Sequence, residues 1–287
     1  MAQRLHLALL VCDTPKPEVL EKYGDYPHMF KEIFAKASQG KNVEITWDSF
    51  DVVRKQEYPD LRELADNKTY QGIVITGSAA SAYTDEPWIL KLLEYTRMLR
   101  VEPYRSQVRL VGICFGHQII ARACGGECEK NPNGWEFGIV SVQLTSLGKQ
   151  FLQTDKALVR IHQVHQDHVK SLPAEFHSLA TTAPHTPIHA LVSDDNQCIS
   201  IQGHPEYRRD AVRILLRLRR DAGIVPKDYA DKQLEKLDKE SDSQDDDVWI
   251  VGRFVDFLLG NLPLETSDSV SPETGLPHGP NVRVGND

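Results

Sequence analysis

The first 115 residues alternate between short apolar runs and stretches with helical spacing of their apolar side chains. Strand-length runs of apolar or β-branched residues are expected at 5–11, 43–50, 72–76 and 108–114. Between them, 29–37 and 88–101 carry apolar residues at the i, i+3, i+4 positions of an amphipathic helix. Nearly continuous apolar strands that alternate with helices predict a parallel sheet covered on both faces.

The middle of the chain follows another pattern, in which short strand candidates are separated by turn residues. These candidates are 138–144, 158–161, 178–182, 188–192 and 198–202. They indicate either antiparallel strands added to the sheet or a small separate sheet. Helices are expected again at 208–219 and 248–259. The predicted fold is therefore α/β, with an open, mostly parallel sheet flanked by helices and extended by antiparallel strands.

The pattern near the end of the chain predicts one domain, residues 1–260, with a charged insertion at about 225–247. The insertion ends in the run DKESDSQDDD and is expected to be solvated, part helix and part loop, with an acidic interaction segment as the alternative. From residue 261 the chain is rich in Ser, Pro, Gly, Asn and Asp. Such a composition cannot bury much apolar surface, so a disordered tail is predicted over 261–287.

Charge and cysteine usage narrow the classes of function. A net charge of -8 argues against a nucleic-acid partner, which selects a basic surface. No apolar stretch reaches the roughly 20 residues of a membrane span, and the run at 5–12 lacks the cleavage site of a signal peptide. A cytoplasmic location is expected, with the nucleus also open. The five cysteines suggest no disulfide framework, and Cys124 and Cys128 lack the second ligand pair of a zinc site.

The segment Gly112–Gly116 carries the strongest chemical signal. It reads Gly-x-Cys-x-Gly where an apolar strand passes into a helical run, which is the thiol counterpart of a nucleophile elbow. Small residues leave room for the tight turn, and the positive end of the following helix favours a thiolate at Cys114. The backbone N–H of Phe115 would then face a developing oxyanion. The alternative is an ordinary buried cysteine.

A general base for this thiol is offered by His204. It follows the strand candidate at 198–202, and strand ends of this kind bind ligands in open α/β sheets. Glu206 lies two residues further on, with Pro205 stiffening the turn, and its carboxylate could fix the imidazole tautomer. A surface histidine and a helix-capping glutamate remain the alternative.

The loop at 76–81 follows a third strand. Gly77 and Ser78 could present backbone N–H groups to the same oxyanion. A phosphate-binding loop would end in Gly-Lys-Ser/Thr, which this loop lacks, and a plain turn is the other alternative.

Taken together, GSAAS at 77–81, GICFGHQ at 112–118 and HPE at 204–206 resemble the class I glutamine amidotransferase family over roughly residues 5–220. The resemblance implies a flavodoxin-like fold and a triad of Cys114, His204 and Glu206. The family's oxyanion loop often has a second Gly followed by Pro, where this chain has Ser78 and Ala79. Nothing in the chain resembles an attached synthetase.

The same resemblance implies contacts with a γ-glutamyl substrate. The stretch His165–Val169 is similar to the family's His-x-Asp-x-Val segment. The implied substrate-binding residues are Gln118, His165, Gln166 and Asp167. A polar loop around these histidines is the alternative.

The runs GICFGHQIIA and CISIQGHPEY are similar to those of free-standing plant and fungal members, among them the γ-glutamyl peptidases that act on glutathione conjugates. The implied activity is hydrolysis of a γ-glutamyl amide through a thioester on Cys114, with no metal and no organic cofactor. Two other roles stay open: a glutaminase subunit that delivers ammonia to a separate synthetase partner, and a non-catalytic binding protein on the same fold.

Overall fold

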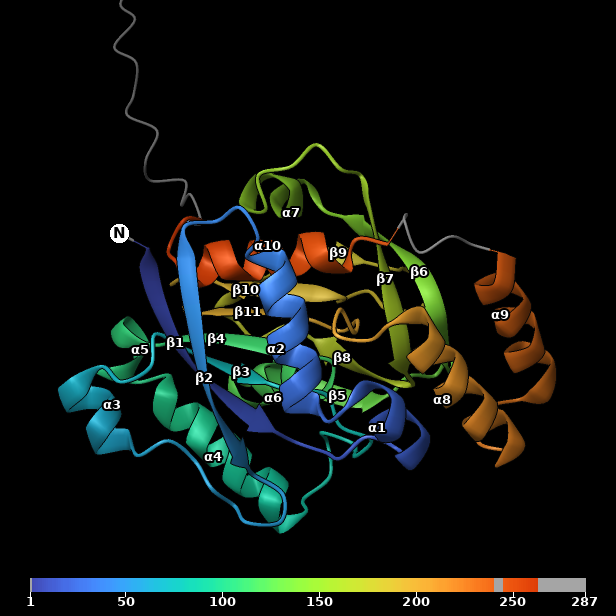
Figure 1. Ribbon diagram of the computed structural model, residues 1–287, viewed down its shortest axis with the longest axis horizontal. Coiled ribbons are helices and arrows are strands. Elements are labelled where there is room, and N and C mark those ends of the chain that lie inside the picture. Colours follow the sequence, from blue (N-terminus) through green and yellow to red (C-terminus); the bar gives the residue numbers. More distant parts are fainter. Residues whose placement is uncertain (1, 240–244, 263–287) are drawn as a thin grey trace, which may run out of the picture.

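A computed structural model describes residues 2–239 and 245–262, and one nine-stranded sheet forms the centre of this part of the chain (Figure 1). The strands are β1 Gln3–Val11, β2 Val43–Asp51, β3 Gly72–Ile75, β4 Arg109–Ile113, β5 Glu127–Lys130, β6 Glu136–Leu144, β7 Leu158–His165, β8 Asp167–Ser171, β9 Phe176–Thr181, β10 Ala190–Ser193 and β11 Cys198–Ile201. The helices are α1 Pro17–Tyr23, α2 Tyr26–Ala37, α3 Leu61–Asn67, α4 Pro87–Leu99, α5 Tyr104–Gln107, α6 Phe115–Ala123, α7 Ser146–Phe151, α8 Arg209–Asp221, α9 Lys227–Lys239 and α10 Asp247–Leu258.

One half of the large sheet is parallel, in the order β2-β1-β3-β4-β11. The strands β3, β4 and β11 are short and buried, as their continuous apolar sequences predict. Ile75 pairs with Gly112, and Gly112 pairs with Ser200, so the three strands end together at one edge. The residues that follow these strands are thereby brought to the same place.

The other half of the sheet is antiparallel and continues β11 through β10, β9, β6 and β7. In addition, β5 and β8 pair with each other as a separate two-stranded sheet. All five strand candidates therefore belong to the large sheet, whereas the small sheet is formed by two segments that were not predicted as strands. The predicted α/β fold with added antiparallel strands is confirmed.

Helices cover both faces of the sheet because β1 is apolar on both sides. Leu7 and Leu9 belong to a core shared with α2, α8, α9 and α10, whereas Ala8 and Leu10 belong to a second core shared with α4 and α6. Figure 1 shows α2 and α10 lying across one face, with α8 and α9 beside β6 and β7. No helix within 2–239 or 245–262 is long and apolar enough to cross a membrane.

The charged insertion is less solvated than the sequence predicted. Ala230, Leu234 and Leu237 of α9 are buried, because this amphipathic helix turns its apolar side towards the core. Asp247 at the start of α10 is buried as well, 3.0 Å from His162 Nδ1 through its Oδ2. Residues 240–244, and the predicted tail from 263 onward, lie outside the described residues.

Candidate active site

Cys114 occupies a strained turn between β4 and α6. Its φ of 51° and ψ of -100° are unusual for a residue with a side chain. The flanking glycines make the turn possible. A Cβ on Gly112 would lie 2.6 Å from the carbonyl oxygen of Gly116, and a Cβ on Gly116 would lie 2.3 Å from that of Ile75. The thiol is therefore placed by backbone geometry that larger residues would prevent.

His204 and Glu206 form a buried pair after β11. His204 Nδ1 lies 2.8 Å from Glu206 Oε1, and the two residues are 3% and 5% exposed. An ionised carboxylate can only accept, so this contact places a proton on Nδ1 and leaves Nε2 for other chemistry. The backbone N–H of His204 donates to the carbonyl of His162 over 2.8 Å, which holds the turn against β7.

The thiol and the imidazole lie on either side of Gly77. A Cβ at this position would be 2.8 Å from Cε1 of His204 and 3.6 Å from Cβ of Cys114. Burial opposes a positive charge on His204, but the negative charges of Cys114 and Glu206 outweigh it and raise the His204 pKa to about 10. The electrostatics thus favour a protonated imidazole at His204.

Two tyrosines hold the imidazole ring in place. The ring of Tyr207 stacks on that of His204, with centroids 4.7 Å apart and an interplanar angle of 24°. The Tyr207 hydroxyl lies 2.8 Å from the hydroxyl of Tyr26 at the start of α2. The orientation of His204 therefore depends on packing against the N-terminal part of the chain as well as on Glu206.

The loop after β3 holds the predicted oxyanion donors Gly77 and Ser78. The N–H of Ala79 donates to Asp13 over 2.8 Å, and that of Ala80 to the Ser78 hydroxyl over 3.1 Å. Among the described residues, neither Gly77 nor Ser78 donates its backbone N–H to a protein acceptor, so both groups are available to an oxyanion. Phe115 is the first residue of α6, so its N–H has no acceptor inside the helix. All three lie around Cys114.

The four predicted substrate-binding residues also meet beside Cys114. Gln118, His165, Gln166 and Asp167 line a cavity of about 60 Å³ together with Cys114. Their polar atoms are partly engaged already. The amide of Gln118 donates to the Asp167 carbonyl over 3.0 Å, and both ring nitrogens of His165 face protein oxygens. The Asp167 side chain accepts a hydrogen bond from Ser81 over 2.7 Å.

Two residues of the site were not found from the sequence. Gln202 is fully buried, and its amide donates to Cys114 Sγ over 3.4 Å while its carbonyl accepts from Gln118 over 3.0 Å. Gln202 lies two residues before His204, at the end of the same strand candidate, and this position in the sequence could have indicated that it belongs to the site. The other residue is Arg219 of α8.

Arg219 lies between two small cavities, one beside Cys114 and the other beside His204. Its guanidinium lies over the ring of Trp135 at 4.8 Å, and burial lowers its pKa below the usual value. One guanidinium nitrogen, Nη1, has no hydrogen-bond partner among the described residues. A cation is thereby held ready for an anionic group near the thiol. No sequence signal singled it out among the other arginines of its helix.

The fold and site define an α/β protein with a thiol at a strand-to-helix elbow and a histidine–carboxylate pair at the end of the next strand. The family model for glutamine amidotransferase class I matches residues 26–216. A glutamine amidotransferase-like protein of Schizosaccharomyces pombe is 31% identical over 264 residues, which cover 88% of this chain and 98% of that protein. The chain belongs to the class I glutamine amidotransferase family.

Relatives in plants and bacteria agree with this assignment. Gamma-glutamyl peptidase 4 of Arabidopsis thaliana is 31% identical over 236 residues, covering 80% of this chain and 88% of the peptidase. The crystal structure of a glutamine amidotransferase from Thermotoga maritima superposes with a TM-score of 0.62 at 19% identity, over 91% of this chain and 98% of that one. At that identity the likeness supports the fold alone.

Proposed function

We propose that this protein hydrolyses γ-glutamyl amide bonds, of a glutathione-like peptide or conjugate or of glutamine, with Cys114 as nucleophile. The observation that carries the proposal is the meeting of Cys114, His204 and Glu206 around Gly77 in a buried site. A thiolate and an imidazolium that share a site supply both the nucleophile and the acid that amide cleavage needs.

In the first step the Cys114 thiolate attacks the γ-carbonyl carbon and a C–S bond forms. The carbonyl oxygen becomes an oxyanion, which the N–H groups of Phe115 and of the Gly77–Ser78 loop stabilise. As the tetrahedral intermediate collapses, the C–N bond breaks and His204 Nε2 gives its proton to the leaving amine. The result is a γ-glutamyl thioester and a neutral imidazole.

In the second step water replaces the amine. His204 Nε2 takes a proton from the water as its oxygen attacks the thioester carbon. The C–S bond then breaks, which releases glutamate and restores the thiolate and the imidazolium. Glu206 accepts the Nδ1–H hydrogen bond throughout and so keeps Nε2 directed at the reacting atoms.

The cavities around the site support a substrate larger than glutamine. The cavity beside His204 shares Asp13, Thr14 and Tyr26 with a neighbouring hollow of about 490 Å³ between α1, α2 and β2. Because His204 protonates the leaving amine, the leaving group lies on this side. Arg219 would bind a substrate carboxylate. The relatives named gamma-glutamyl peptidases agree with this interpretation.

The test is glutamate release by the purified protein without ATP, from glutamine, glutathione and a glutathione S-conjugate in parallel. We expect release from the glutathione species. Cys114→Ala should lower kcat/KM by at least about 10³-fold, because the nucleophile is lost. Cys124→Ala is the matched control, since Cys124 lies at the far end of α6 and should leave the rate unchanged within about twofold.

If the purified protein released no glutamate from any of the three substrates, the result would contradict a stand-alone hydrolase. The remaining roles would then be a glutaminase subunit that needs its synthetase, or a binding protein. Release that survives Cys114→Ala would contradict the proposed chemistry itself.

A further inference from the structure

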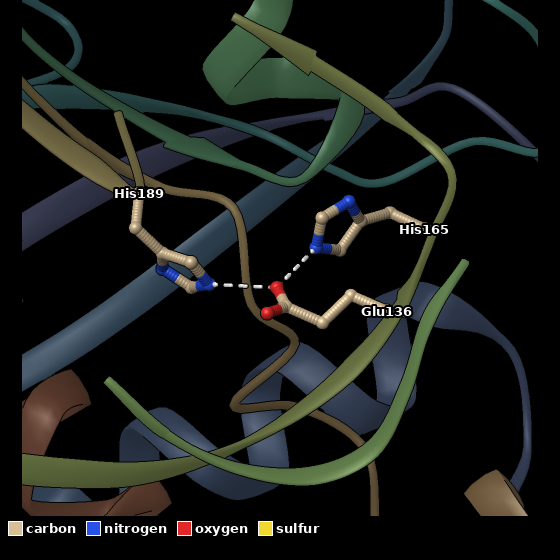
Figure 2. A group of neighbouring side chains, drawn as sticks. All are labelled: Glu136, His165 and His189. Atoms are coloured by element: carbon tan, nitrogen blue, oxygen red, sulfur yellow. Dashed lines mark hydrogen bonds and ion pairs between the residues drawn. The ribbon is translucent and has the colours of Figure 1, made fainter. Parts of the chain in front are cut away.

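Glu136, His165 and His189 form a buried cluster next to the predicted substrate-binding residues 166–167, here called the Glu136 cluster (Figure 2). Glu136 opens β6, and His165 ends β7 as its register partner. His189 directly precedes β10. The three are 7%, 4% and 0% exposed. Figure 2 shows both imidazoles pointing at one oxygen of the carboxylate.

The contacts of His165 show that the cluster needs an added positive charge, from a proton or a metal ion. His165 Nδ1 lies 3.0 Å from the Asp167 carbonyl oxygen, which can only accept, so Nδ1 carries a proton. In a neutral imidazole Nε2 then holds a lone pair, yet it faces Glu136 Oε2 at 3.0 Å. Two acceptors at this distance require a proton or a metal ion near them.

His189 supplies a second, independent observation. Neither of its ring nitrogens makes a hydrogen bond to a described residue, although the side chain is fully buried. Its Nε2 points at the same Glu136 Oε2, 3.6 Å away. A buried imidazole left in this state costs free energy, on the order of 1–3 kcal/mol for the unsatisfied group. A cation at the centre of the cluster would give Glu136 Oε2, His165 Nε2 and His189 Nε2 a shared partner.

We propose that the Glu136 cluster binds a divalent transition-metal ion of the zinc type through Glu136 Oε2, His165 Nε2 and His189 Nε2. Imidazole nitrogen and carboxylate oxygen are established ligands of this ion, at about 2.0–2.2 Å. Such bonds place neighbouring ligand atoms of a tetrahedral site about 3.3 Å apart. The observed 3.0 and 3.6 Å from Glu136 Oε2 bracket this value, and all three ligand atoms lie within 4.8 Å of one another.

The surroundings match a metal site in a further respect. Histidine ligands commonly donate their second ring N–H to a backbone carbonyl, which fixes tautomer and orientation, and His165 does this to Asp167. The other explanation, a proton shared within the cluster, requires an imidazolium in a buried place.

The consequence of metal binding is structural and does not depend on the proposed hydrolysis. The Asp167 carbonyl accepts from both His165 and the amide of Gln118. A metal on His165 would therefore fix the segment 165–167, which lines the cavity beside Cys114.

The test is metal binding by the full chain after chelator treatment. Zn²⁺ content is measured by equilibrium dialysis and mass spectrometry, and Co²⁺ is added separately to record its absorption spectrum. We expect one equivalent of Zn²⁺, with at least tenfold weaker binding in Glu136→Gln and in His189→Gln. The Co²⁺ spectrum should show tetrahedral d–d bands without sulfur charge transfer.

Two control variants exclude the other candidate ligands. Cys114→Ser removes the thiol beside His204, and His162→Gln removes the centre of a second group with Asp245 and Asp247. Both should keep the equivalent of zinc. The proposal is overturned if the wild-type chain binds no zinc, or if binding is lost in either control but kept in Glu136→Gln. If neither cluster variant folds, the Co²⁺ spectrum of the wild-type protein decides. A sulfur charge-transfer band would overturn the proposal, and tetrahedral d–d bands without such a band would support it.

Discussion

The side-chain amide of Gln202 is directed at the sulfur of Cys114 from within the same sheet edge. A hydrogen bond to a charged group is worth about 1.5–3 kcal/mol, and a thiolate in a buried site has little water to replace it. Under the proposed function, Gln202 is therefore a positioning residue that holds the Cys114 thiolate, and it acts on substrate only through Cys114.

Gln202→Met keeps the size of the side chain and removes the donor. We expect the rate of Cys114 alkylation by iodoacetamide at neutral pH to fall about 10- to 100-fold, because the thiolate loses this hydrogen bond. Gln118→Met is the comparison, since its amide contacts Gln202 and Asp167 instead of the sulfur. Equal alkylation rates in wild type and Gln202→Met would refute the role.

The protonation state of His204 can be measured directly. Its pKa of about 10 arises because the charges of Cys114 and Glu206 outweigh burial. In Cys114→Ala one of these charges is gone, so the His204 pKa should fall. Titration of the imidazole ¹⁵N resonances between pH 5 and about 10 would follow both proteins, and identical curves would show that the thiol does not carry the charge.

Single residues were predictable from the sequence where a short segment holds the whole motif. Cys114 between two glycines, and His204 with Glu206, are motifs of this kind, and the structure places them together. Arg219 differs because its importance follows from a guanidinium nitrogen, Nη1, that has no hydrogen-bond partner among the described residues. Only the folded chain shows that Arg219 lines the site while Arg213 and Arg220 of the same helix bind surface carboxylates.

At the scale of elements, the join between β4 and α6 leaves no room for a side chain at its two glycines. In Gly116→Ala the added methyl carbon would lie 2.3 Å from the Ile75 carbonyl oxygen. Relieving this overlap requires a shift of the β3 backbone, which costs free energy. We expect a loss of about 2–4 kcal/mol in the free energy of unfolding, by urea denaturation.

Gly252→Ala is the matched control, because Gly252 is a helical glycine in α10 with its nearest heavy atom 3.7 Å from the added methyl. This change should be neutral or stabilise the protein by up to about 1 kcal/mol. Equal effects at the two sites would show that the close packing of the elbow does not matter.

Long elements were predictable because their periodicity extends over several turns or a full strand. Among the short elements, the apolar strands β3, β10 and β11 were predicted. The helices α1, α3, α5 and α7, of at most seven residues each, and the four-residue β5 were missed. Segments of this length show no clear period, and tertiary contacts decide their conformation. Half-exposed β5 forms a strand through its pairing with β8, about 40 residues away in the chain.

At the scale of the whole molecule, the hollow beside the site should select substrates by size. Ser49, an exposed residue of β2, lines this hollow opposite Asp13 and Tyr26. Under the proposed function, Ser49→Trp should raise KM for a glutathione S-conjugate about tenfold and leave kcat/KM for glutamine within about twofold. The added ring would fill space that only a large leaving group uses.

Thr46→Trp places the same side chain on the same strand outside the hollow and serves as control. A uniform loss with all substrates in Ser49→Trp would indicate general damage to β2 and would contradict this location for the leaving group. The hollow itself could not be predicted from the sequence, because it is formed by loops from three separate elements.

The order of strands has a consequence for how the protein is made. Among the strands within 2–239 and 245–262, β11 is the last along the chain, yet it lies in the middle of the sheet, between β4 and β10. As the chain leaves the ribosome, Cys114 emerges long before His204. Until β11 has been synthesised, the edge of β4 that pairs with it stays without its neighbouring strand. The two halves of the sheet cannot join until about 200 residues have been synthesised. Under the proposed function the nascent protein is inactive during that interval, and the open edge of β4 is a site where a chaperone would prevent aggregation.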